Sequence, residues 1–208
     1  MNKTLEQVRK TSGATCPDWQ ALCVPDLDCN RSLRLFTEGD DLYDAMTAAI
    51  MQAERSIRLE SFIFAGDAVG RQFAEVLSAK ARDGVDVRFH FDSRGAVTGY
   101  SWPVFREMVS AGVKLKWYRP WSWRHPTLYF QRNHRKLLII DDQELFLGGF
   151  NIRVENSRRL YGEGRKRDTH LSVRGSLVLR AAALFDQLWN ETIRTSRTAI
   201  SQLRRHHS

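Results

Sequence analysis

The sequence from Arg132 to Ile152 reads RNHRKLLIIDDQELFLGGFNI, and it joins two strand patterns to a set of polar residues. The apolar run at 137–140 is too short for a helix and consists of branched side chains, which predicts a buried strand. A second strand is predicted at 145–147, across a turn at 142–143, and two glycines follow it. This stretch is therefore predicted to be a β-hairpin within a sheet.

The polar residues of the hairpin follow the spacing H-x-K-x4-D-x6-G-G-x-N. His134 and Lys136 are two residues apart, so their side chains point to the same side of the first strand's leading end. The hairpin brings Asn151 to the same edge. Lysine charge, carboxamide N–H donors and the close backbone approach allowed by Gly148 and Gly149 suit a bound phosphoryl group. His134 is then placed to attack phosphorus, whereas a solvated surface hairpin does not explain the combined spacing.

This spacing resembles the signature of the phospholipase D superfamily. Gly149 stands where many members have a serine, and the glycine pair is similar to that of bacterial cardiolipin synthases. The likeness runs from about Leu33 to Trp189, through LRLFTEGDDLYDAM, RLESFIF, DVRFHFDSRG and RDTHLSVRG, and resembles the first half of a cardiolipin synthase. It implies that Asp141 is the acidic signature residue, with an orienting role through hydrogen bonding and charge. The predicted catalytic set is His134, Lys136 and Asp141.

Strand and helix patterns alternate before the hairpin. Helix periodicity begins at Gly39-Asp40-Asp41, and a second helix ends at Asp83-Gly84. Strands are predicted at 33–36, 56–64, 85–91 and 113–118. The order indicates the α/β class, a layered phospholipase D-like domain with a mixed β-sheet flanked by helices. The predicted division is an N-terminal extension at 1–31, a single catalytic domain at 32–190 and a basic tail or linker at 191–208.

Composition restricts the partners. The 208 residues are 42% hydrophobic, enough for one well-cored domain, and the net charge is +8. This charge favours an anionic partner, either phospholipid headgroups or nucleic acid. No stretch approaches the ~20 apolar residues of a membrane span, and no signal peptide is recognised, so the expected location is cytoplasmic, peripheral to the inner face of the membrane. Cys16, Cys23 and Cys29 are interpreted as free thiols.

Other residues are weaker candidates for the site. Glu60 lies within a predicted strand and is expected to reach the edge of the substrate pocket, or else to pair with nearby basic residues. Trp121 and Trp123 lie in the aromatic stretch WYRPWSWRHPTLYF, where they are predicted to contact lipid at the membrane interface. Such aromatic residues could equally stack on unpaired bases. The basic stretch at 153–167 is expected to add positive potential over the pocket, and Asp168 to anchor structure.

A single histidine leaves the chemistry incomplete. Phosphodiester exchange needs a nucleophile and also an acid for the leaving alcohol, and one imidazole cannot be both at once. The resemblance implies two facing motifs, one histidine forming a phosphohistidine and the other protonating the leaving oxygen, with lysines in place of a metal. No metal or cofactor is therefore expected. Since this chain has one H-x-K, it is predicted to form a homodimer or to be half of a longer enzyme.

The resemblance implies a phosphatidyltransferase of the cardiolipin synthase kind. Such an enzyme would transfer a phosphatidyl group to phosphatidylglycerol or another alcohol, and transfer to water would be phospholipase D activity. The single motif, the length and the positive charge also suit a dimeric endonuclease of the same superfamily. A third possibility is an inactive half-module that keeps only a phosphate-binding pocket.

Overall fold

The computed structural model of the protein describes residues 33–92, 102–118 and 133–205, with side chains as far as Glu191. The predictions for Trp121, Trp123 and the three cysteines concern residues outside these ranges.

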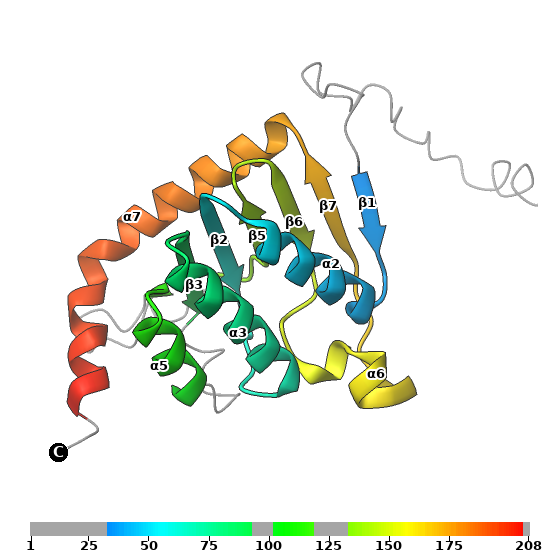
Figure 1. Cartoon of the computed structure of the whole chain (residues 1–208), viewed down its shortest axis with the longest axis horizontal. Coiled ribbons are helices and arrows are strands. Elements are labelled where there is room, and N and C mark those ends of the chain that lie inside the picture. The colour runs from blue at the N-terminus through cyan, green and yellow to red at the C-terminus, as the bar shows by residue number, and fades with distance from the viewer. Residues whose placement is uncertain (1–32, 93–101, 119–132, 206–208) are drawn as a thin grey trace, which may run out of the picture.

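Seven strands form one mixed sheet in the order β1-β7-β6-β5-β2-β3-β4 (Figure 1). Strands β2, β3 and β4 are parallel, whereas each remaining neighbouring pair is antiparallel. The predicted mixed sheet is therefore confirmed. The strands are β1 (Leu33–Phe36), β2 (Ser56–Ser61), β3 (Asp86–Asp92), β4 (Lys114–Tyr118), β5 (Leu137–Ile140), β6 (Glu144–Gly148) and β7 (His170–Arg174).

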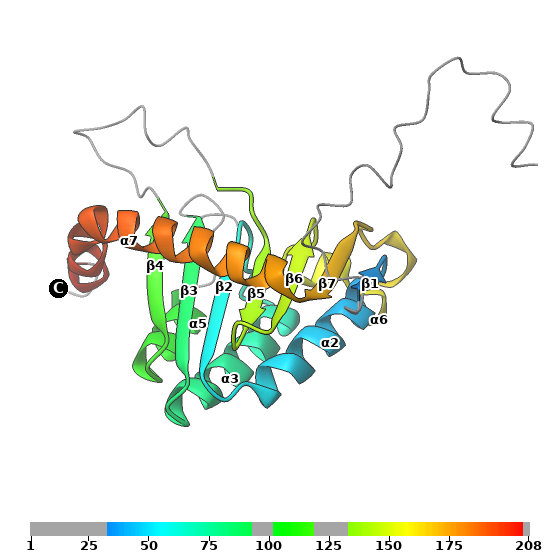
Figure 2. The ribbon, with the colours of Figure 1, turned by 90° about the horizontal axis from the view of Figure 1, so that it is seen from above.

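Helices cover both faces of the sheet, which gives three layers (Figure 2). One face carries α2 (Gly39–Gln52), α3 (Ala68–Arg82) and α5 (Trp102–Ser110), and the other carries α7 (Ser176–Arg205). The short helix α6 (Arg158–Tyr161) follows the hairpin and contacts α2. Among the helices described, none combines the length and the apolar character needed to cross a membrane.

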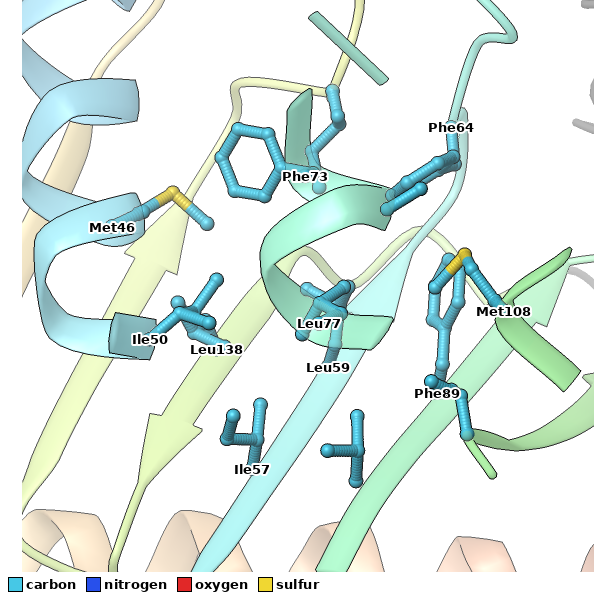
Figure 3. Packing of buried hydrophobic residues seen from close by; sticks show 14 of the residues in the cluster. Met46, Ile50, Ile57, Leu59, Phe64, Phe73, Leu77, Phe89, Met108 and Leu138 are labelled. Carbon is cyan, nitrogen blue, oxygen red and sulfur yellow. The ribbon is translucent and has the colours of Figure 1, made fainter. Parts of the chain in front are cut away.

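The main core lies between the sheet and helices α2, α3 and α5 (Figure 3). Ile57 and Leu59 of β2 are fully buried there, against Ile50 of α2 and Leu77 of α3. Because side chains alternate along a strand, Arg58 and the other even-numbered residues of β2 point to the opposite face, toward α7.

The contact between α7 and the sheet is part apolar and part ionic. Val178, Phe185 and Trp189 of α7 pack on an apolar cluster that includes Leu137 and Ile139 of β5. Over β2 and β3 the same helix meets two arginines, and the Asp186 carboxylate lies 3.0 Å from a guanidinium nitrogen of each of them, Arg58 and Arg88.

Helix α7 continues through the predicted domain boundary at residue 190. Its backbone is helical to Arg205, so residues 191–205 extend the helix. The division of the chain into a domain and a tail stays a prediction.

Candidate active site

The segment Asn133–Lys136 lies at the carboxyl ends of the parallel strands, where α/β sheets commonly place chemistry. It leads into β5, which runs antiparallel to β2 and begins opposite Glu60. The backbone N–H of Asn133 donates to the Asp92 carboxylate at the end of β3, with the nitrogen 3.0 Å from Oδ2. The motif therefore starts over the ends of β2 and β3.

His134 presents an exposed imidazole at this edge. The ring stacks on Phe62, which follows β2, with ring centroids 4.0 Å apart and planes inclined by 20°. Lys136 Nζ donates to the main-chain oxygen of His134 at 2.8 Å. Burial lowers the pKa of Lys136, while the negative charge of Asp168 opposes that shift. Since the imidazole forms no hydrogen bond with any described residue, it is available to a substrate.

Asn151 is held in one orientation by its neighbours. Its side-chain oxygen accepts from the backbone N–H of Ile63 at 3.0 Å. Its main-chain oxygen accepts from the Tyr43 hydroxyl and from the Asn156 side-chain amide. The Nδ2 group of Asn151 donates to no residue in the described part of the chain, so the carboxamide offers N–H donors to a ligand.

Gly148 and Gly149 lie against β7 with no room for a side chain. A Cβ on Gly148 would overlap the main-chain oxygen of Thr169 and the ring of His170, and one on Gly149 would overlap the Asp168 carboxylate. The Asp168 carboxylate therefore lies directly against Gly149, in the space that a side chain at position 149 would need. Because its charge also acts on Lys136, we assign Asp168 to the site. Sequence reasoning gave Asp168 only an anchoring role.

His170 is a second imidazole behind the glycines. It is 2% exposed, and neither ring nitrogen has a hydrogen-bond partner among the described residues. Burial lowers the pKa of His170 to about 4, with Asp168 raising it and Lys136 lowering it further. His170 is therefore neutral at pH 7.

Asp141 lies at the opposite end of β5 from Lys136, about 16 Å along an extended strand. Its carboxylate accepts from the backbone N–H groups of Glu54, Arg55 and Ser56 at 2.8, 2.8 and 2.7 Å. The structure therefore does not bring Asp141 to the catalytic group that the sequence predicted. Its hydrogen bonds orient the start of β2 against the hairpin turn.

Asp141→Asn is expected to reduce stability by about 1 to 3 kcal/mol, because a neutral amide cannot accept all three N–H bonds. Burial raises the pKa of Asp141, but the three hydrogen bonds and Arg55 outweigh it and lower the pKa. This stabilisation is present above the ordinary Asp pKa of about 3.9 and is lost as the pH falls through the folded-state value. Urea unfolding at pH 7 measures the difference, with the exposed Asp83→Asn as control. A large loss of kcat at unchanged stability would contradict the structural role.

Glu60 is not at the pocket edge. It is 1% exposed and faces α7, where Arg135 Nε lies 2.9 Å from Oε2. His90 Nδ1 is 3.3 Å from Oε1. A direct contact of Glu60 with substrate is therefore incompatible with this burial, and the alternative expectation of pairing with a basic residue is the one observed.

The basic stretch after the hairpin is largely paired with acidic residues. Arg165 and Arg167 both contact Glu38, which precedes α2. Arg159 pairs with Asp44 of α2. These pairs neutralise part of the positive potential that the sequence predicted over the pocket, and they hold the segment around α6 on α2.

Solved structures with the same fold show which class of domain this is. Nuc from Salmonella typhimurium, described as a phospholipase D family member, superposes with a TM-score of 0.62 at 19% identity, over 77% of this chain and 95% of Nuc. NucT from Helicobacter pylori gives a TM-score of 0.61 at 17% identity, over 77% of this chain and 96% of NucT. At these identities the likeness concerns the fold, which is that of phospholipase D-like domains.

Sequence comparison gives the family. The model "Cardiolipin synthase, PLD-like domain" matches residues 46–189, and the chain belongs to this family. The cardiolipin synthase of Geobacillus kaustophilus is 37% identical over 162 residues, which are 74% of this chain and 31% of that protein. The major cardiolipin synthase ClsA of Bacillus subtilis is 32% identical over 163 residues, 78% of this chain and 34% of that protein. The chain thus spans about a third of the length of these curated relatives.

Proposed function

We propose that this chain carries one catalytic half of a phosphatidyltransferase of the cardiolipin synthase kind, acting through a phosphohistidine at His134. The observation that carries the proposal is the exposed His134 ring, which shares one edge of the sheet with Lys136 and the N–H donors of Asn151. Family membership supports the reaction class. Because the chain spans about a third of its curated relatives, the activity of the whole protein belongs to this proposal.

The proposed reaction has two displacements at phosphorus. A nitrogen of His134 forms a bond to phosphorus, and the bond to the leaving alcohol oxygen breaks while a second imidazole protonates that oxygen. An acceptor hydroxyl then gives its proton to the second imidazole and attacks, and the P–N bond returns its electron pair to His134. Lys136 and Asn151 stabilise the charge on the phosphoryl oxygens. Phosphatidylglycerol is the proposed acceptor, and water would give hydrolysis.

The second imidazole is proposed to come from another copy of this chain or from a second motif-bearing half. An apolar sheet face next to the site supports such pairing. Leu33 and Leu35 of β1 are 64% and 56% exposed, and Leu147, directly before Gly148, is 40% exposed. Leu35 and Leu147 both lie opposite Leu171 of β7, so they share one face. Exposed apolar patches of this kind mark interaction surfaces.

The proposed partner is an anionic phospholipid surface at the inner face of the membrane, with Trp121 and Trp123 in contact with lipid. The net charge of +8 supports an anionic ligand. The same charge supports the second candidate, a dimeric endonuclease, because nucleic acid is also an anionic ligand. A half-module that binds phosphate without turnover is the third candidate.

Parallel assays separate these candidates. The full chain is incubated with phosphatidylglycerol vesicles and with single-stranded DNA, and its mass in solution is measured. Cardiolipin and glycerol as products support the proposal, whereas cleavage of DNA alone supports the endonuclease. A monomer that binds vesicles but does not convert lipid supports the half-module.

Excess EDTA is expected to leave this activity unchanged, because Lys136 and Asn151 supply charge stabilisation that a metal would otherwise provide. The initial rate is compared with and without the chelator, after exchange into chelator-treated buffer. Loss of turnover that magnesium or zinc restores would refute this expectation.

A further inference from the structure

The motif segment that carries His134 is attached to the sheet mainly through side chains. Strand β5 begins only at Leu137, and the N–H of Gly148 donates to the main-chain oxygen of Lys136 at 3.2 Å. Before that point, Asn133 is held by the Asp92 carboxylate, and its own side-chain oxygen accepts from the N–H of Arg135 at 3.1 Å. The position of His134 therefore depends on what fixes Arg135.

Arg135 is fixed by a two-point ion pair with Glu60. Its Nε lies 2.9 Å from Oε2, and its Nη2 donates to Oε1 at 3.0 Å. Only the Nη2–Oε1 contact has hydrogen-bond geometry, because Oε2 accepts no hydrogen bond from the described residues and its contact with Nε is electrostatic. A guanidinium that contacts both oxygens of one carboxylate is restricted in direction as well as in distance. The Glu60 side chain is itself 0% exposed, whereas that of Arg135 is 37% exposed. The buried Glu60 carboxylate therefore restricts the position of the more exposed Arg135 side chain.

The position of the Glu60 carboxylate is in turn fixed by its contact with His90 of β3, which packs against α7. Glu60 lies opposite His90 in the parallel β2–β3 pair, and His90 Nδ1 is 3.3 Å from Oε1. The His90 ring makes edge contacts with Phe185 and Trp189 of α7. The ion pair therefore connects the motif segment to two central strands and to the helix behind them.

We propose that Glu60 and Arg135 are positioning residues that hold His134 and Lys136 in reacting geometry, an inference that rests on the proposed function. Arg135 lies between these two residues, and its guanidinium contacts Glu60, whereas the His134 ring stacks on Phe62. With Arg135 held on the α7 side by Glu60, His134 stacks on Phe62, two residues beyond Glu60. The end of β2 thus orients both sides of the motif segment.

The test is chemical rescue of Arg135→Ala. We expect kcat to fall about 100-fold, as for a reacting group displaced by about 1 Å, with KM nearly unchanged. Guanidinium chloride below denaturing concentration should restore kcat, because the truncation leaves space beside Glu60 at a surface pocket of about 260 Å³ that the Arg135 side chain lines in wild type. Sodium chloride at the same concentration should not restore kcat. The control is Arg174→Ala, which removes another arginine paired with a carboxylate, Glu144, at 2.8 Å and should keep wild-type kcat.

A second measurement does not depend on activity. In wild type, the ring current of Phe62 should shift the His134 ring protons upfield in the NMR spectrum, with assignment by loss of the signals in His134→Ala. Arg135→Ala should move these signals toward those of an unstacked histidine, and guanidinium should move them back. If Arg135→Ala does not fold, Arg135→Lys keeps a charge beside Glu60 without the two-point geometry and should show the same shift.

Wild-type signals together with wild-type kcat in the folded Arg135 variants would overturn the positioning role. A loss of kcat that guanidinium does not restore, with the His134 signals unmoved, would also overturn it. If the wild-type chain shows no turnover, the proposed function is in doubt, while the NMR measurement still decides whether the ion pair positions His134.

Discussion

His134→Ala is expected to lower kcat for phosphatidyl transfer by about 10⁴-fold or more, because the nucleophile that forms the covalent intermediate is removed. The folded protein should be nearly as stable as wild type, since His134 is exposed and its side chain contacts Phe62 at the surface of the site. Cardiolipin formation from phosphatidylglycerol vesicles measures the activity, and thermal unfolding measures the stability.

Trapping of the intermediate gives this prediction a second readout. Wild-type protein quenched during turnover with lipid labelled in its phosphate should carry acid-labile label, and His134→Ala should carry none. Arg174→Ala serves again as the folded control. An alanine variant that retained both label and turnover would show that the nucleophile is elsewhere in the chain.

Mixing wild-type and His134→Ala chains is expected to reduce activity with the square of the wild-type fraction, if the working unit is a two-fold dimer. A composite site needs one imidazole to attack and another to transfer the proton, so a dimer with a single His134 lacks one of them. The mixtures are equilibrated under conditions that allow subunit exchange, and initial rates are measured at constant total protein.

Two other outcomes of this mixing experiment would indicate a different source of the second imidazole or no need for one. A decline that is linear in the wild-type fraction would mean that each chain works alone, which would contradict the dimer. If the wild-type chain is inactive and a second motif-bearing half restores activity, the second imidazole comes from that half. The mixed-chain curve is interpreted together with the mass in solution, because a monomer cannot give the quadratic dependence.

The fold was largely predictable because the apolar periods of its strands and helices are regular. The second strand shows where this reasoning fails. A strand was predicted over 56–64, yet β2 ends at Ser61. Phe62 leaves the ladder to stack on His134, and the N–H of Ile63 donates to the Asn151 side chain. Both contacts involve residues more than seventy positions away, which no local pattern contains.

The site residues that belong to one sequence motif could be predicted. Those that strand pairing brings to the site from elsewhere in the chain could not. His134, Lys136 and Asn151 meet at one edge because a hairpin joins them. The distance to Asp141 could have been recognised, since four strand residues separate it from Lys136. Asp168 reaches the site because β7 pairs with β6, and this pairing leaves no local pattern in the sequence. The catalytic, lipid-contact and substrate-binding roles stay predictions.

The edge strand β1, which is the first strand in the sequence, pairs with β7, which is the last, and this pairing has a consequence for folding during synthesis. β1 ends at Phe36 and pairs with β7, which begins at His170. At about 5 to 20 residues per second, the ribosome needs about 7 to 27 s to make the chain between them. During that time the apolar β1 strand has no partner in the sheet, and unpaired strands of this kind are prone to aggregate. The nascent chain is therefore expected to depend on a chaperone until β7 has emerged.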